Sequence, residues 1–392
     1  MHPSTSASAP DPALDPSAVH APATAPAPAS APSGAPRLRI ERRTTTPRLA
    51  LVMVPVVSIT GALTVGALVL AVAGRNPLTV YAAMFAGAFG SEYGLAETLV
   101  KAIPLLLTAL GVGIAFRMQL WNIGAEGQLH VGAIAATGTA LFLMPSAPAI
   151  VLVPAMMLAG LAGGALWALV PGALRAYLRV NEIITSLMLN YVAILFMEYL
   201  VYGPWKNPQG FGFPGTAFLP DAAWLPRLGT TRVHLGLVFG LVAAGLLFIV
   251  LQRTVWGYEI RVIGENERAA RYAGMNIARN ILLVMALSGA LAGLAGMSEV
   301  AGISHQLQRN LSPGYGYTAI IVAWLARLNP WATVLVSFLF AGLLVGGDQL
   351  QISMGLPAAI APMLQGTILF FLLGGEVLAR YRLHLAFRPG KG

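Results

Sequence analysis

Long apolar segments are the feature that most restricts what this chain can fold into. Each runs without alternation, and most reach the length of about 20 residues that a helix needs to cross a bilayer. Strands of a membrane barrel would instead alternate polar and apolar residues. Charged residues make up 10% of the chain, against about 25% in soluble domains. The apolar segments span residues 49–73, 97–116, 124–144, 148–170, 183–203, 234–252, 280–302, 313–328, 331–347 and 360–379.

These segments predict an all-α, polytopic integral membrane protein with about 8–10 transmembrane helices. The number is a range because the eighth and ninth segments, 313–328 and 331–347, are short for a span. Tilted, broken or re-entrant helices would account for such lengths. Just before the eighth segment, Ser312–Tyr317 combines proline and glycine with two tyrosines. That composition favours a bent, non-helical start and suggests a hinge.

The two ends of the chain differ in composition from the apolar body. Ala, Pro and Ser fill 26 of the first 36 positions, and a run of arginines follows. Such a segment cannot bury a core. We therefore predict a disordered, then basic, cytoplasmic tail over 1–48, a transmembrane domain over 49–380, and a short basic cytoplasmic tail over 381–392.

The positions of the basic residues predict the orientation. With the N-terminus in the cytoplasm, 18 of the 24 Lys and Arg residues fall in inside segments, as the positive-inside rule expects. The net charge of +9 thus follows membrane topology. We expect contact with membrane lipid and none with a nucleic acid polymer. Five of the other six lie outside, Arg75, Lys206, Arg227, Arg232 and Arg309, and Lys101 lies near the outer end of the second segment.

The stretch from Gly264 to Asn276 is polar and charged, although long apolar runs flank it. It lies within the cytoplasmic segment of about 253–279 and is long enough for about two and a half helical turns. Ala269 and Ala273 fall on one face, with Ala270 and Gly274 beside them, and charged residues fringe that face. Small residues permit close approach, so we predict a docking helix. The alternative is an ordinary solvated loop.

Two groups of polar residues interrupt the apolar spans, where they are costly to bury. The first is the run from Trp121 to Gln128, in which Glu126 lies between Ala125 and Gly127. It indicates a broken helix start, where a carboxylate can meet free backbone amides. The alternative is a cap that sets the angle of the span.

The second group is a polar stripe on the fifth span. Glu182, Ser186 and Asn190 follow at intervals of four residues and therefore share one helix face. Such a stripe lines either a water-filled path or a helix–helix contact. The candidate residues of a translocation path are Trp121, Asn122, Glu126, Glu182, Ser186, Asn190 and Tyr191.

No enzyme site emerges from the sequence. There is no GxxxxGK[ST] phosphate loop, no HExxH pair, no GxSxG and no cysteine. We predict no catalytic residue, no metal ligand and no cofactor. If ATP drives the protein, a separate chain must bind it.

Three runs occur together in order: Trp121–Gln128, Asn181–Tyr191 and Gly264–Met275. In this combination the chain resembles the membrane permease subunits of ATP-binding-cassette (ABC) importers, in the family for branched-chain amino acids, ribose and simple sugars. The resemblance covers about 50–385 and is greatest to the nucleoside branch. It implies a permease that forms the path for a small polar solute, a nucleoside or a simple sugar, in a bacterial inner (plasma) membrane.

The resemblance also implies partners and a coupling site. The partners are ABC ATPase subunits, an extracytoplasmic substrate-binding protein and a second permease subunit. In this family a cytoplasmic coupling helix sits in a cleft of each ATPase, and by position it corresponds here to Glu265–Ala273. The residues assigned to coupling are Glu265, Asn266, Arg268, Ala269, Ala270, Ala273 and Gly274.

A second hypothesis comes from another class of protein. An ion-coupled secondary transporter of the same kind of solute would need no ATPase, but it would need ionisable residues within the membrane. Glu198 and Glu299 are the candidates, and both are predicted near the outer boundary.

Overall fold

The computed structural model describes residues 37–42, 48–210, 212–357 and 359–386. The chain divides into two units, one made by the two ends of the chain and one by residues 45–380. In the first unit, β1 (Arg37–Arg42) and β2 (Tyr381–Ala386) pair as an antiparallel two-stranded sheet. The other parts of the predicted tails, 1–36, 43–47 and 387–392, lie outside the described residues, so the predicted disorder stays a prediction.

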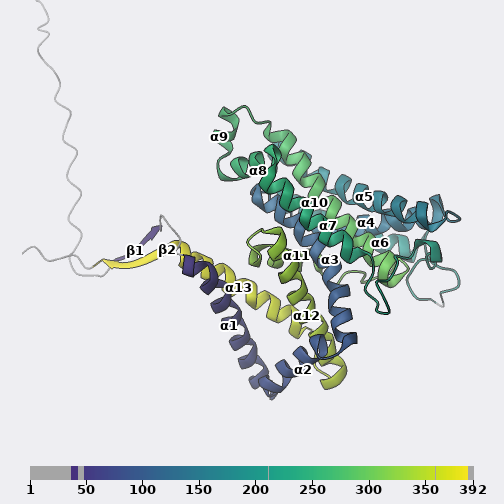
Figure 1. The fold of residues 1–392 in the computed structure, drawn as a ribbon, viewed down its shortest axis with the longest axis horizontal. Coiled ribbons are helices and arrows are strands. Elements are labelled where there is room, and N and C mark those ends of the chain that lie inside the picture. The colour runs from purple at the N-terminus through teal and green to yellow at the C-terminus, as the bar shows by residue number, and fades with distance from the viewer. Residues whose placement is uncertain (1–36, 43–47, 211, 358, 387–392) are drawn as a thin grey trace, which may run out of the picture. The chain divides into compact units, whose positions relative to one another are not determined.

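The second unit is helical, and every one of the ten predicted apolar segments coincides with a helix (Figure 1). The all-α membrane class is thereby confirmed. The helices are α1 (Arg48–Val72), α2 (Pro77–Phe89), α3 (Glu92–Arg117), α4 (Ala125–Gly138) with the π-helical η1 (Thr139–Leu143), α5 (Ala149–Leu178), α6 (Glu182–Tyr202), the short η2 (Asp221–Ala223), α7 (Gly236–Arg253), α8 (Val255–Glu265), α9 (Glu267–Tyr272), α10 (Ile277–Glu299) with the π-helical η3 (Val300–Ser304), α11 (Tyr315–Leu325), α12 (Pro330–Met354) and α13 (Ile360–Arg380).

Within the described residues, six helices are long and apolar enough to cross a membrane, and a bent pair could supply a seventh span. That pair is α1 with α2, which meet at 117°. The sequence analysis did not predict α2. Its start is nonetheless encoded locally, because the Asn76 side chain accepts from the amide of Leu78 and Pro77 occupies the first helical turn.

The two predicted short spans differ in the structure. α11 has only 11 residues, about 16 Å of helix, which is roughly half of a bilayer core. α12 has 25 residues and is a full-length helix. It begins one residue before the predicted segment, because Asn329 caps it ahead of Pro330, and it continues seven residues beyond the predicted end.

Glycines let the central helices pack backbone against backbone. α10 lies against α5, α4 and α3 in the middle of the helical unit (Figure 1). Gly160 and Gly164 of α5 face Gly289 and Gly293 of α10, each pair spaced by four residues. A Cβ atom built on Gly164 would lie 2.8 Å from the Cα of Gly293. Small residues at this spacing are a common means of close helix contact in membranes.

The connection between α6 and α7 is an ordered cap over the end of α10. The amide of Thr216 donates to the carbonyl of Leu307, and the amide of Leu307 donates to the hydroxyl of Thr216. The amide of Leu225 donates to the carbonyl of Ala301 at 3.0 Å. Leu219 and Leu225 of this connection are buried. The long segment between η3 and α11 therefore runs along this cap before it reaches the short helix.

Candidate functional site: a buried polar junction and an exposed charged segment

The polar run after α3 folds into a buried turn that starts α4. The side chain of Asn122 donates to Gln128 and to Ser288 of α10, both at 2.9 Å. It also accepts from the amide of Gly124 and the side chain of Gln128. Asn122 is completely buried, so these four bonds use its full amide capacity and fix the turn against α10.

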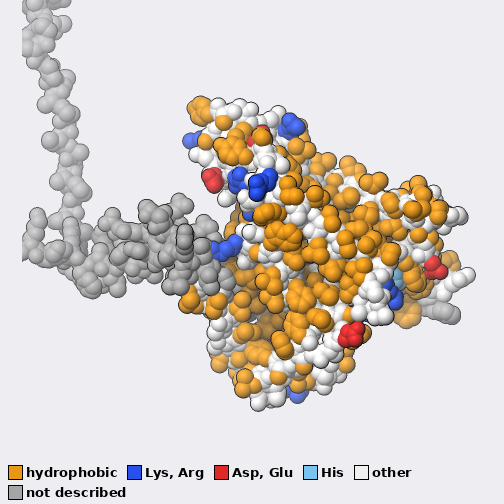
Figure 2. Space-filling view, viewed as in Figure 1, with side chains coloured by type: hydrophobic (Ala, Val, Ile, Leu, Met, Phe, Trp, Pro, Cys, Tyr) orange, Lys and Arg blue, Asp and Glu red, His pale blue; other side chains and the backbone are white. Residues whose placement is uncertain are grey.

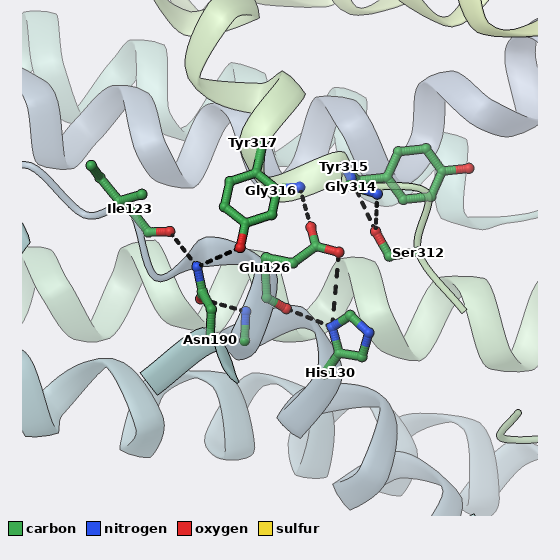
Figure 3. Close-up of polar contacts among 10 residues, drawn as sticks. Ile123, Glu126, His130, Asn190, Ser312, Gly314, Tyr315, Gly316 and Tyr317 are labelled. Atoms are coloured by element: carbon green, nitrogen blue, oxygen red, sulfur yellow. Dashed lines mark hydrogen bonds and ion pairs between the residues drawn. The ribbon is translucent and has the colours of Figure 1, made fainter. Parts of the chain in front are cut away.

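Glu126, in the first turn of α4, connects that helix to α11. Its Oε2 accepts from the backbone amide of Gly316 at 2.6 Å (Figure 3). The first turn of α11 has amides without intrahelical partners, and a carboxylate there is favoured by the helix dipole. The ring of His130 lies 4.0 Å from the other carboxylate oxygen and contacts the Glu126 carbonyl at 2.8 Å. The side chain of Glu126 is thus buried between two helix starts.

Asn190 of α6 completes the junction. Its Oδ1 accepts from the amide of Gly127 at 2.8 Å, and its Nδ2 donates to the carbonyl of Ile123 at 2.8 Å (Figure 3). The hydroxyl of Tyr317 is within 3.3 Å of the same Nδ2. We call Asn122, Glu126, Asn190 and Gly316 the polar junction. It joins the starts of α4 and α11 to the middle of α6.

The other members of the predicted stripe also lie against the turn before α4. Ser186 is fully buried, and its Cβ packs on Gly124. Glu182 lies 3.4 Å from both the amide of Trp121 and the guanidinium of Arg175. In this conformation the stripe packs on the turn before α4 and on the first turn of α4. The covering turn lies about 60 residues away in the chain.

The two aromatic candidates are placed differently from the buried polar ones. Tyr191 is 56% exposed on α6. Trp121 is partly exposed and belongs to an aromatic cluster with Phe116 and Trp324, whose ring centroids lie 4.9 and 5.7 Å from its own. The structure therefore does not bring Tyr191 into the junction.

The predicted coupling helix consists of two helices. α8 ends at Glu265, and α9 is a separate short helix whose N-cap is Asn266. The Asn266 side chain accepts from the amides of Arg268 and Ala269, a cap that an asparagine at this position could have indicated. Charged side chains gather over these helices, whereas apolar ones cover most of the face in view (Figure 2).

Only part of the predicted face of small residues on this segment is exposed to solvent. Ala269, Ala273 and Gly274 are exposed, but Ala270 is completely buried. Gly274 adopts the left-handed conformation (φ 77°) that ends the helix, as the sequence indicated. Among the residues assigned to coupling, those exposed in the structure are Glu265, Asn266, Arg268, Ala269, Ala273 and Gly274.

An open groove of about 1160 Å³ runs between α9 and the end of α5. Arg175 and Arg179 line one side, and Arg268 and Arg271 line the other. Arg271 pairs with Glu267 at 2.8 Å. The groove is thus mainly basic, which gives the exposed segment a surface suited to an acidic partner.

Two histidines far from this groove lie close together, a pairing that was not predicted from the sequence. His234 is fully buried beside Gly302 of η3, and its Nδ1 accepts from the amide of Gly236. His305 stacks on Trp224 with ring centroids 4.0 Å apart. Burial, together with the nearby His305, lowers the pKa of His234 to about 4. Both rings have a buried nitrogen without a partner among the described residues.

Metal coordination finds no support within the described ranges. No three His, Asp or Glu side chains come together there in a way that could hold an ion.

Discontinuous helices that meet at buried polar groups, inside a bundle of membrane-length helices, define a multi-pass membrane protein of the transporter class. Comparison with known proteins gives the family. The chain belongs to the family described as "branched-chain amino acid transport system / permease component", whose sequence profile matches residues 94–373. It is a permease subunit of an ABC importer, that is, a transport subunit. The ion-coupled alternative is not supported.

Relatives agree over nearly the whole chain. The glucose ABC transporter permease protein TsgB13 of Haloferax volcanii is 39% identical over 89% of this chain and 94% of its own length. The guanosine ABC transporter permease protein NupP of Bacillus subtilis is 34% identical over 83% of this chain and 94% of its own. The nucleoside ABC transporter permease protein NupB of Lactococcus lactis is 31% identical over 82% and 90%. Family membership implies ATPase subunits and a substrate-binding protein as partners.

Proposed function

We propose that this permease imports a nucleoside or a simple sugar across the bacterial inner membrane, with both chain termini in the cytoplasm. The observation that carries the proposal is the match to sugar and nucleoside permeases over more than four fifths of the chain. A nucleoside and a sugar share a neutral, hydroxyl-rich ring. The orientation is supported by the excess of basic residues in the segments placed inside.

Uptake by a reconstituted complex separates the two substrate classes. Labelled guanosine and labelled glucose would each be offered to proteoliposomes, with unlabelled uridine, adenosine and ribose as competitors. Import of guanosine that uridine or adenosine inhibits, and glucose does not, would assign a nucleoside. Import of glucose alone would assign a sugar. Import of neither would contradict both assignments.

The coupling role is proposed for α9 and its flanks. The segment is charged and exposed, lies beside the basic groove, and corresponds to the family's coupling helix. ATPase subunits would dock there, and ATP binding would pull on the segment. Ala269 is the best position to test, because it is exposed whereas Ala270 is buried in the chain itself.

Replacing Ala269 by Trp places a large ring on the proposed docking face. The expected result is loss of ATPase co-purification and of uptake, while the permease itself stays folded. Ala73→Trp is the matched control, since Ala73 is an exposed alanine in the predicted outer connection after α1. Normal assembly and uptake in the Ala269→Trp variant would rule out docking at this face.

The polar junction is proposed to hold the closed state of the path. Its buried side chains accept hydrogen bonds from backbone amides of the turn before α4, of α4 and of α11 in this conformation. A solute could reach them only after α11 moves away from α4. Before that movement, Asn122, Glu126, Ser186 and Asn190 would keep the path closed. Glu182, held near Arg175, marks the cytoplasmic end. Trp121 and Tyr191 offer exposed rings that could stack on a base.

A pair of permease subunits completes the proposal. The outward faces of α5 and α6 expose large apolar side chains, among them Leu158, Leu166, Leu195 and Tyr199. Lipid or a second permease subunit would cover such faces. Cross-linking of differently tagged copies in membranes would distinguish a homodimer from a pairing with a different permease chain.

A further inference from the structure

We propose that Arg117 is a positioning residue. It transmits movement of the docking segment, Gly264–Asn276, to α11 and from there to the polar junction. The inference rests on the proposed docking of ATPase subunits at α9. It follows from three successive contacts between elements that are far apart in the sequence, each of which leaves little room for independent movement.

The first contact joins the docking segment to the end of α3. Gly264, in the last turn of α8, packs directly on the backbone of Arg117 and Met118. A Cβ atom at Gly264 would overlap the Arg117 carbonyl oxygen and lie 3.1 Å from the Cα of Met118. Since no side chain lies between them to absorb a displacement, α8 cannot shift toward α3 without moving it.

The second contact joins the end of α3 to the turn between α11 and α12. The guanidinium of Arg117 donates two hydrogen bonds, from Nε at 3.0 Å and Nη2 at 2.9 Å, to the carbonyl oxygen of Leu328. Two donors in one planar group fix direction as well as distance. A lysine has a single ammonium on a flexible stem and cannot reproduce this fork.

The turn that receives this fork is itself strained. Arg327 and Leu328 have φ values of 51° and 58°, two successive left-handed positions occupied by residues other than glycine. Each such residue costs of the order of 1 kcal/mol and persists only where surrounding contacts enforce it. The Arg117 fork is one of those contacts, and it holds the turn that follows α11.

The third connection is the helix α11 itself, which joins the turn at Leu328 to the polar junction. The helix has 11 residues, and its two ends are held by different partners. One end lies at the turn bound by Arg117, and the amide of Gly316 in the first turn at the other end donates to Glu126 at 2.6 Å. A short rigid helix passes a displacement of one end to the other. Movement at Leu328 is therefore delivered to the polar junction.

The test measures coupling separately from assembly. Arg117→Gln and Arg117→Lys permeases would be purified with their ATPase and binding-protein partners and reconstituted. ATPase content, thermal stability, ATP hydrolysis and uptake of labelled guanosine or glucose would be recorded. Arg75→Gln is the matched control, an exposed arginine in the connection between α1 and α2.

The expected result is a complex that assembles and hydrolyses ATP but moves at least about fivefold less solute per ATP in Arg117→Gln, the low end of usual coupling energies. Arg117→Lys should recover part of that loss. Unchanged uptake per ATP in Arg117→Gln overturns the proposal. Loss of ATPase binding in Arg117→Gln also overturns it, because Arg117 would then serve docking. Failure of the unmodified permease to hold the ATPase contradicts the docking function, and this inference with it.

A second variant keeps the proposal testable if Arg117→Gln does not fold. Arg327→Gly removes left-handed strain at the turn and frees its backbone, and it leaves the packed Leu328 side chain in place because Arg327 is exposed. The expected outcome is unchanged or higher thermal stability together with lower uptake per ATP. Stability and coupling that both remain at the unmodified level would overturn the proposal.

Discussion

Glu126 and Gly316 are 190 residues apart in the chain, yet the carboxylate of one holds the backbone amide of the other at 2.6 Å. This bond joins the first turns of α4 and α11, and α11, with 11 residues, is too short to span a bilayer alone. Broken helices whose starts meet at a polar group are the usual construction of transporter binding sites. In this permease the polar group between the two helix starts is the carboxylate of Glu126.

Removing the Glu126 carboxylate should open this connection. In Glu126→Ala the buried Gly316 amide loses its partner, at a cost of about 1–3 kcal/mol. We expect a lower unfolding temperature and strongly reduced uptake. Glu126→Gln keeps a carbonyl oxygen for the same bond, so it should retain most of the stability. Thermal unfolding and uptake of both variants check this, and equal stability of Glu126→Ala and the unmodified permease would contradict it.

Overfilling the contact between α5 and α10 should destabilise the helical unit. Gly164→Val adds side-chain atoms where a single Cβ already lies 2.8 Å from the Cα of Gly293. Forced separation of packed helices costs about 1–3 kcal/mol or more. Gly366→Val is the control, since no described atom lies within 4 Å of a Cβ there. Unfolding temperatures in detergent should fall for the first variant and not for the second.

Acidification should destabilise the packing around His234, at the start of α7. Burial lowers its pKa in the folded protein from 6.5 to about 4. Between these values the unfolded chain binds a proton and the folded one does not, so stability is fully present above about pH 6.5 and falls as pH drops toward 4. The groups that act on this histidine and on its neighbour are His305, Arg227, Arg232 and Asp221.

The slope from one such proton is about 1.4 kcal/mol per pH unit. Unfolding temperatures at pH 7.5, 6 and 5 would measure it. His234→Gln should flatten the dependence, since glutamine does not titrate in this range. A variant with the same pH response as the unmodified protein would show that the loss arises elsewhere.

Apolar length was sufficient to predict where the long helices lie, because a helix in lipid must satisfy its own backbone. It failed for α2, whose 13 residues are too few to indicate a span. The break at Asn266 has a local signal, a capping asparagine, and could have been predicted.

The polar junction could be predicted only in part. The stripe of Glu182, Ser186 and Asn190 identified a helix face, but periodicity does not reveal what covers it. The covering turn lies near Gly124, and the partner of Glu126 is a backbone amide, which any residue type could supply. The burial of Ala270 likewise depends on packing against other segments.

The central claim is that a separate ATPase, docked at α9, drives solute through this permease. The most direct measurement is uptake into proteoliposomes that hold the permease, its ATPase subunits and its binding protein, with ATP or an imposed proton gradient as the only energy source. The account predicts uptake with ATP alone and its loss in Ala269→Trp. Uptake sustained by the proton gradient without ATP would contradict it.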